Sequence, residues 1–243
     1  MLNIIYCELL KLKKSYIIHL AVISGMFMLI LMDLVSLINK EKFQSFKHYS
    51  STIEMLNILL LYTILFSLIT GYVFSREFTD KTASVIYACS ISRFKIFISK
   101  LITIYILISL VYIVRIISIY LSYYILMHTL PESTFIVNHI EYNVYSLIFE
   151  FLLMPIPILI TNMSKNLIAP VVYGIVGTIV TMITLGSSSL VIKYFPLVAP
   201  YEFVEKIYRP NLVNLNYSVI SGIICFIVSM IISIYQYNRD DII

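Results

Sequence analysis

The chain has 243 residues, of which 60% are hydrophobic and only 12% are charged, and its mean hydropathy is +0.94. Soluble domains are about 45–50% apolar, so a soluble core cannot use this much apolar surface. A spanning helix needs about 20 apolar residues to cross about 30 Å of hydrocarbon. The length therefore predicts six or so membrane-spanning helices, and it excludes a separate soluble catalytic domain. The net charge of +4 is attributed to topology and contact with membrane lipid, and it does not indicate nucleic-acid binding.

Residues 1–15 have the period of an amphipathic helix that lies in the membrane interface, with a frayed tail as the alternative. The apolar face and the charged face of this helix carry, in turn, Leu2, Ile5, Tyr6, Leu9 and Leu12, and Glu8, Lys11 and Lys14. The first span follows at about residues 16–38. Its apolar run is too long for a signal peptide and lacks a small-residue cleavage site, so we expect a retained helix.

Five further apolar runs lie at about residues 56–74, 96–127, 145–160, 167–185 and 219–235. A polar stretch, residues 39–51, separates the first two spans. Pro155 and Pro157 remove backbone donors and predict a kink or break in the fourth span. Residues 186–214 are apolar but interrupted by serines and prolines, which predicts short re-entrant or interfacial helices on the extracellular side. We therefore expect an all-α membrane protein with one domain, residues 1–243, and six transmembrane helices.

The distribution of Lys and Arg predicts the orientation, because these residues accumulate in cytoplasmic loops. With the N-terminus inside, ten of them lie on the inner side and six on the outer side, while Arg115 lies within a span. The inner set is Lys11, Lys13, Lys14, Arg76, Lys81, Arg93, Lys95, Lys100, Lys165 and Arg239, and the outer set is Lys40, Lys42, Lys47, Lys193, Lys206 and Arg209. The excess favours a multi-pass protein with both termini in the cytoplasm.

Motifs for catalysis are missing from the sequence. The six glycines are scattered and form no G-x-x-x-x-G-K-[ST] loop, so the chain cannot hydrolyse ATP alone. There is no H-E-x-x-H, and Cys7, Cys89 and Cys225 form no C-x-x-C, so neither a metal site nor a disulfide framework is indicated. We expect no catalytic residue, metal or cofactor in this chain.

Arg115 and Glu150 are the two deepest ionisable residues that the predicted spans contain. Charged groups are costly inside a membrane and therefore suggest a function. Both residues lie at similar sequence distances from the loop between spans three and four, so we expect them to face each other at one depth. Two interpretations stay open: an ion pair that orients two helices, or a direct role in substrate passage.

The segment from Ser75 to Lys100 reads S-R-E-F-T-D-K-T-A-S-V-I-Y-A-C-S-I-S-R-F-K-I-F-I-S-K. Its charged start, short apolar middle and basic restart predict an amphipathic cytoplasmic helix between spans two and three, within residues 75–95. We expect Glu77, Asp80 and Lys81 to face water or a partner, since such a helix suits docking into a groove of another protein. A plain solvated loop is the alternative.

This segment resembles the ABC-2-type permeases, the membrane subunits of one class of ATP-driven exporter. Their pattern is roughly R-E-x-x-x-G-T, a short apolar helix, then P-[IV]-S-R-x-x-[IL] and a Lys near the start of the next span. The matching residues are Arg76, Glu77, Thr82, Ile91, Ser92, Arg93, Ile96 and Lys100. The chain departs from the pattern at Lys81, where glycine is usual, and at Ser90, where proline is usual. The E-L-x-K-L-K-x-S helix from Glu8 to Ser15 and the six spans extend the resemblance to essentially the whole chain.

The resemblance implies that the N-terminal helix and the segment after span two contact an ATP-binding subunit, which holds ATP and Mg²⁺. The implied contact residues are Arg76, Glu77, Asp80, Lys81, Thr82, Ser92 and Arg93, together with Glu8 and Lys11 of the N-terminal helix. A second permease subunit, identical or related, is also implied. In its small size the chain resembles the bacterial permeases that expel antimicrobial peptides, including bacitracin-type and lantibiotic-immunity transporters. This resemblance implies a location in the bacterial cell membrane.

Three other functions compete with an ATP-driven exporter. A transporter driven by ion gradients is expected to show internal repeats, and none relates residues 1–120 to residues 121–243. A membrane enzyme needs a cluster of polar residues that the sequence does not show. A non-transporting immunity subunit that sequesters its ligand keeps the same docking helix, so the sequence does not separate it from a pump.

Overall fold

The protein is a bundle of long helices in the computed structural model, which describes residues 1–13, 15–39, 45–82, 91–186, 195–208 and 216–239. Six helical segments are long and apolar enough to cross a membrane: Ile17–Ile38, Phe46–Thr79, Arg93–Met127, Ser133–Ser164, Ile168–Gly186 and Tyr217–Asn238. The described residues include helices and no strands. The prediction of an all-α protein with six spanning helices is confirmed.

The second span begins earlier than the hydropathy predicted. Helix α3 (Phe46–Leu56) continues through the π-helical turn η1 (Asn57–Tyr62) into α4 (Thr63–Thr79) as one long segment. The side chain of Ser45 caps α3 by accepting a hydrogen bond from the backbone N–H of His48 at 3.3 Å. Residues 46–51 of the polar stretch expected at 39–51 are therefore the first part of a spanning helix, and residues 40–44 lie outside the described residues.

The fourth span is also longer than predicted, and it is interrupted where the prolines stand. It consists of α7 (Ser133–Leu153) and α8 (Pro155–Ser164), which are separated at Met154. Pro155 is the first residue of α8, a position whose backbone N–H has no partner inside the helix anyway. The expected break in the fourth span is confirmed.

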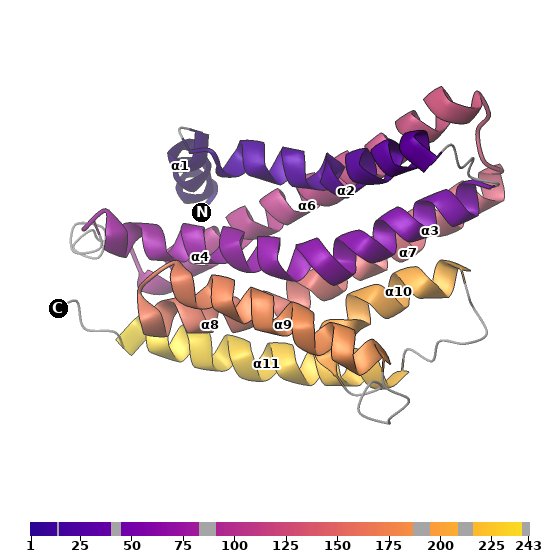
Figure 1. Cartoon of the computed structure of the whole chain (residues 1–243). Coiled ribbons are helices and arrows are strands. Elements are labelled where there is room, and N and C mark those ends of the chain that lie inside the picture. The colour runs from indigo at the N-terminus through magenta and orange to yellow at the C-terminus, as the bar shows by residue number, and fades with distance from the viewer. Residues whose placement is uncertain (14, 40–44, 83–90, 187–194, 209–215, 240–243) are drawn as a thin grey trace.

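The long helices run side by side, and the N-terminal helix and the end of the last span lie at the same end of the bundle (Figure 1). The same end carries α1 (Leu2–Lys13), which crosses the long helices at a steep angle (Figure 1). Helix α6 (Arg93–Met127) and the α3–α4 segment are central, since 50% and 61% of their most apolar 18-residue stretches are buried inside the protein. The corresponding shares in α2 (Ile17–Asn39) and α11 (Asn216–Arg239) are only 28% and 22%, so the apolar side chains of these two helices face outward, where lipid would lie.

Helix α9 (Ile168–Gly186) packs closely along α4 because glycines remove side chains from their contact. A Cβ built on Gly174 would lie 2.8 Å from the Cα of Ile64, and one built on Gly71 would lie 2.5 Å from the ring of Pro170. Any side chain at either position would push the two helices apart.

Two short helices precede the last span, as expected. They are η3 (Pro196–Val198) and α10 (Ala199–Tyr208), and α10 packs on α7 and α3 at the end of the bundle opposite α1 (Figure 1). Residues 187–194 and 209–215 of the predicted segment 186–214 lie outside the described residues. The extracellular position of this segment stays a prediction.

Candidate functional site: the polar network between α1, α4 and α6

Helix α1 turns a different face toward the bundle from the one predicted. Glu8 and Leu12 are its buried residues, whereas Leu2, Tyr6 and Leu10, spaced four residues apart, are exposed. Glu8, which the period of the helix assigned to the charged face with Lys11, is therefore buried against the bundle. Its charge is tolerated there because Lys11, part of a cluster of charged side chains at the junction of α1, α4 and α6, pairs with it.

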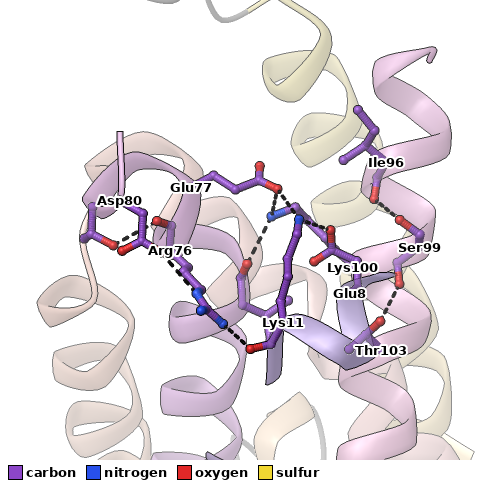
Figure 2. A network of polar contacts seen from close by, with 11 residues as sticks. Glu8, Lys11, Arg76, Glu77, Asp80, Ile96, Ser99, Lys100 and Thr103 are labelled. Carbon is purple, nitrogen blue, oxygen red and sulfur yellow. Dashed lines mark hydrogen bonds and ion pairs between the residues drawn. The ribbon is translucent and has the colours of Figure 1, made fainter. Parts of the chain in front are cut away.

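Glu77 is the centre of this cluster and connects three helices, as Figure 2 shows. Its Oε1 lies 3.0 Å from Nζ of Lys100 on α6 and 3.5 Å from Nζ of Lys11 on α1. Lys11 Nζ also lies 2.5 Å from Oε1 of Glu8, and Lys100 Nζ donates to the backbone carbonyl of Val73 at 3.1 Å. Two carboxylates thus alternate with two ammonium groups across the junction of α1, α4 and α6.

Burial gives this network its strength. Only 1% of the Lys100 side chain and 5% of the Glu77 side chain are exposed, so water screens their attraction little. At Lys11, which is half-buried, burial by itself lowers the pKa, but the carboxylates of Glu8 and Glu77 outweigh it and raise that pKa. The expectation that Glu77 faces water or a partner is wrong, because its carboxylate is enclosed by the protein's own lysines.

Arg76 links the end of α4 to the last turn of α1. Its Nη1 donates to the backbone carbonyl of Lys11 at 2.7 Å, and this carbonyl lies in the last turn of α1, where helical acceptors lack partners. Its Nε lies 3.2 Å from Oδ2 of Asp80, whose side chain is 53% exposed. Helix α1 is therefore held both by buried charges and by a charge-assisted hydrogen bond to its backbone.

The backbone conformation at Lys81 accounts for the glycine that is usual at this position of the family pattern. Its backbone has φ 54°, the left-handed region, directly after the end of α4. The backbone N–H of Thr82 donates to the carbonyl of Glu77 at 2.9 Å, and that of Lys81 donates to the carbonyl of Phe78 at 3.2 Å. These two bonds form a Schellman motif, in which the left-handed residue is most often glycine.

The remaining predicted contact residues lie where the chain enters α6. Ser92 precedes the helix and is exposed, and Nη1 of Arg93 donates to the backbone carbonyl of Asn238 at 3.0 Å. Arg93 thereby joins the start of α6 to the end of α11. The predicted amphipathic helix falls mainly on residues 83–90, outside the described residues.

The structure therefore brings five of the predicted residues together, namely Glu8, Lys11, Arg76, Glu77 and Asp80, and leaves Lys81, Thr82, Ser92 and Arg93 around them at one end of the bundle. The sequence analysis assigned Lys100 no role beyond matching the family pattern and counting toward the inner side. A lysine about two turns inside a long apolar helix was the available signal, because such a charge requires a partner.

A family model described as "ABC-2 family transporter protein" matches residues 4–181, which is more than half of the chain. The chain belongs to the ABC-2 transporter family. No curated protein and no solved structure matches it. The protein is thus the membrane-spanning permease of an ABC-2 transporter, and this family implies an ATP-binding partner subunit.

The permease contains a second charged cluster, deep in the bundle, that the sequence analysis located only in part. Arg115 on α6 is fully buried, donates to the side-chain oxygen of Asn143, and has its Nη2 3.9 Å from Oε1 of Glu54. Rings of Tyr112 and Tyr62 cover its guanidinium at 4.4 and 5.2 Å. Glu150 takes part in none of the ion pairs between described residues, so the partner of Arg115 is Glu54 on α3.

Glu54 is well supplied with donors for its carboxylate. Nδ2 of Asn143 lies 3.0 Å and Nε2 of His139 lies 3.0 Å from Oε1, while the hydroxyl of Tyr208 donates to Oε2 at 2.8 Å. Glu54 escaped notice because hydropathy placed the start of the second span at residue 56. The spacing of Phe46, Tyr49 and Ile53 could have revealed it, since these buried apolar residues recur every three to four positions.

Asp33 on α2 is a further, half-buried acceptor that the sequence analysis missed. The hydroxyls of Tyr49 and Ser122 donate to its two carboxylate oxygens at 2.8 and 2.6 Å. The permease therefore holds α2, α3 and α6 together by polar contacts inside an apolar bundle, and such contacts specify which helices meet.

Proposed function

We propose that this permease is the membrane subunit of an ATP-driven exporter, and that the bundle end formed by α1, the end of α4 and the start of α6 receives the motion of the ATP-binding subunits. The observation that carries the proposal is the network in which Glu77 joins Lys11 and Lys100. A displacement of the chain next to Asp80 would move α1, α4 and α6 together, because separating the buried ion pairs of Glu77 with Lys11 and Lys100 is costly. We place this end and both termini in the cytoplasm.

The exposed residues beside the network form the proposed docking surface. Asp80, Lys81, Thr82 and Ser92 are exposed and lie on both sides of residues 83–90, while Arg76 and Arg93 tie the two flanks to α1 and α11. A rigid surface with exposed polar groups suits contact with an ATP-binding subunit that transmits motion mechanically, without any chemical step in the permease. Glu77 acts behind this surface, as a residue that positions α1 and α6.

Co-purification tests this proposal. The permease and its ATP-binding subunit are expressed together, extracted in mild detergent, and the permease is captured by a tag. The double variant Asp80→Lys, Thr82→Glu changes only exposed residues next to the network, and Lys47→Glu changes an exposed residue near the opposite end of the bundle. We expect the ATPase to accompany the native chain and Lys47→Glu, and to be lost from the double variant. A native chain that comes away alone, or a double variant that retains the ATPase, contradicts the proposed docking surface.

We further propose that the substrate is an amphipathic or hydrophobic compound, such as an antimicrobial peptide, and that two permease subunits, identical or related, form the path. Support comes from an open apolar groove of about 570 Å³ between α6 and α7, lined by Ile116, Ile117, Tyr120, Leu121, Tyr124, Leu130, Ile136 and Ile140. An apolar groove at a membrane-facing surface suits a ligand that partitions into lipid before it is moved.

Substrate-stimulated ATP hydrolysis by the reconstituted transporter tests the substrate class and separates export from sequestration. We expect a cationic antimicrobial peptide such as bacitracin or nisin to raise the hydrolysis rate, and a hydrophilic peptide of the same length to leave it unchanged. Binding of the peptide without any change in hydrolysis would favour a non-transporting immunity subunit. Transport that persists without ATP but collapses with an ionophore would favour an ion-gradient mechanism.

A further inference from the structure

Glu150 lies in a small cavity between α4, α7, α8 and α9. Only 4% of its surface is exposed, and the cavity leaves about 10 Å³ to the centre of a water molecule, which is room for about one water. The lining consists of Thr63, Ser67, Glu150, Leu153, Met154, Pro157, Tyr173 and Leu197. The hydroxyl of Ser67 already donates to the carbonyl of Thr63 at 2.7 Å, so it does not donate to Glu150.

The carboxyl group of Glu150 has no hydrogen-bond donor and no ion-pair partner among the described residues. This is unusual for a carboxylate, because an ionised carboxylate that is buried without donors or a counter-ion is strongly disfavoured. Glu54 on α3 shows the opposite arrangement, since Asn143 and Tyr208 donate to its carboxylate and Arg115 and His139 lie within 4 Å of it. The two buried glutamates are therefore in different chemical environments.

Arg115 cannot neutralise both carboxyl groups. Its charge acts on Glu150, but it forms its ion pair with Glu54 and its hydrogen bond with Asn143. Tyr173 on α9 lines the same cavity, and Tyr62 on η1 and Tyr112 and Arg115 on α6 interact electrostatically with Glu150, with Cys225 of α11 acting on Tyr173. Glu54 has both Arg115 and His139 beside its carboxylate, whereas none of the described lysines and arginines forms an ion pair with Glu150, so an ionised Glu150 would be an unpaired charge in the membrane interior.

We propose that Glu150 is a proton-binding site inside the membrane, which carries its proton as a neutral carboxylic acid at neutral pH in this arrangement of the helices. The proton is exchanged with water that enters the cavity between α4, α7, α8 and α9, and it leaves to that water when the carboxylate forms. Separation of these helices would hydrate the carboxyl group and release the proton, so the closed arrangement and the bound proton favour each other.

Infrared spectroscopy of the purified protein tests the proposal directly, because a protonated carboxylic acid has a C=O stretching band that a carboxylate lacks. The expected result is such a band at neutral pH in the native chain, lost in Glu150→Gln, which keeps the shape of the side chain without the acid. If Glu150→Gln does not fold, Glu150→Leu replaces it, since the cavity is lined mainly by apolar side chains.

Two matched variants identify the source of the band. Burial raises the pKa of Glu202, whose carboxylate contacts the hydroxyl of Ser218, so Glu202→Gln removes a second group that could hold a proton. Glu54→Gln removes the carboxylate that is paired with Arg115. The band is expected to persist in both variants. A band that is absent from the native chain at neutral pH, survives Glu150→Gln, or disappears in Glu202→Gln would overturn the proposal.

The pH dependence of thermal unfolding is a second test for a proton on Glu150. The native chain is expected to lose thermal stability as the pH rises from about 5 through neutral pH, because the unfolded chain gives up the Glu150 proton near the ordinary glutamate pKa of about 4.3 while the folded chain keeps it, and Glu150→Gln is expected to lose less over the same range. Equal losses in the two proteins would contradict a proton on Glu150.

Discussion

Breaking the buried pair of Glu77 and Lys100 should destabilise the permease far more than breaking the exposed pair next to it. At the observed 3.0 Å, the attraction between the two charges is about 5–6 kcal/mol for an effective dielectric constant of about 20. Desolvation of the two groups offsets much of this attraction in the native state. Removing one partner, however, leaves the other charge buried, which costs about 3–5 kcal/mol.

The two single variants should differ because Glu77 has a second partner. In Lys100→Met, Glu77 keeps Lys11 at 3.5 Å, so we expect a loss near the lower limit, about 3 kcal/mol. In Glu77→Gln, Lys100 keeps the carbonyl of Val73 and the ring of Phe74 but loses its carboxylate, so we expect a loss near the upper limit, about 5 kcal/mol. The double variant should be more stable than Glu77→Gln alone, because neither charge remains unpaired.

Unfolding by increasing sodium dodecyl sulfate in mixed micelles, followed by far-ultraviolet circular dichroism, gives the four free energies of this cycle. Asp80→Asn is the matched control, since it breaks the exposed pair of Asp80 and Arg76 and should cost about 0.3–0.5 kcal/mol. If Lys100→Met costs no more than Asp80→Asn, or if the double variant is the least stable protein, the buried network does not hold α1, α4 and α6 together.

The other predictions concern the backbone, the α4–α9 contact and the interior cluster. Lys81→Gly should raise the unfolding free energy by about 1 kcal/mol, because glycine adopts φ 54° without strain, and Lys81→Ala should bring no such gain when both are measured by the same titration. Gly174→Ala should lower it by about 1–3 kcal/mol by forcing α9 away from α4, whereas Gly186→Ala, with no atom within 4 Å of the new Cβ, should change it by less than about 0.5 kcal/mol. Tyr208→Phe should lower the unfolding free energy by about 1.5–3 kcal/mol, because the Tyr208 hydroxyl donates to the buried carboxylate of Glu54 at 2.8 Å and links α10 to α3. Tyr145→Phe, which removes an exposed hydroxyl bonded to Glu141, is the control, and an equally small loss in both variants would contradict the role of the Tyr208 bond.

The sequence alone determined where the membrane spans lie and where the chain must bend. Burial of a segment in lipid depends on its average composition over about 20 residues, which can be read without knowing any neighbour. Pro155 likewise acts through its own missing N–H, which interrupts the fourth span where the sequence predicted it. The spans came out too short at Phe46 and Ser133 because polar residues such as His139 are tolerated there by partners on other helices.

Only the tertiary structure decided which charges meet. Glu77 was identified from the sequence as an important residue but expected to face a partner, and it faces Lys11 and Lys100 instead. Arg115 was expected opposite Glu150, and its ion pair is with Glu54. The physical reason is that the side on which a residue emerges depends on the rotation of its helix, and rotation is set by contacts along the whole helix. The π-helical turn at Asn57–Tyr62 changes that rotation within one span, and the break at Met154 interrupts another, so neither pairing follows from spacing along the chain.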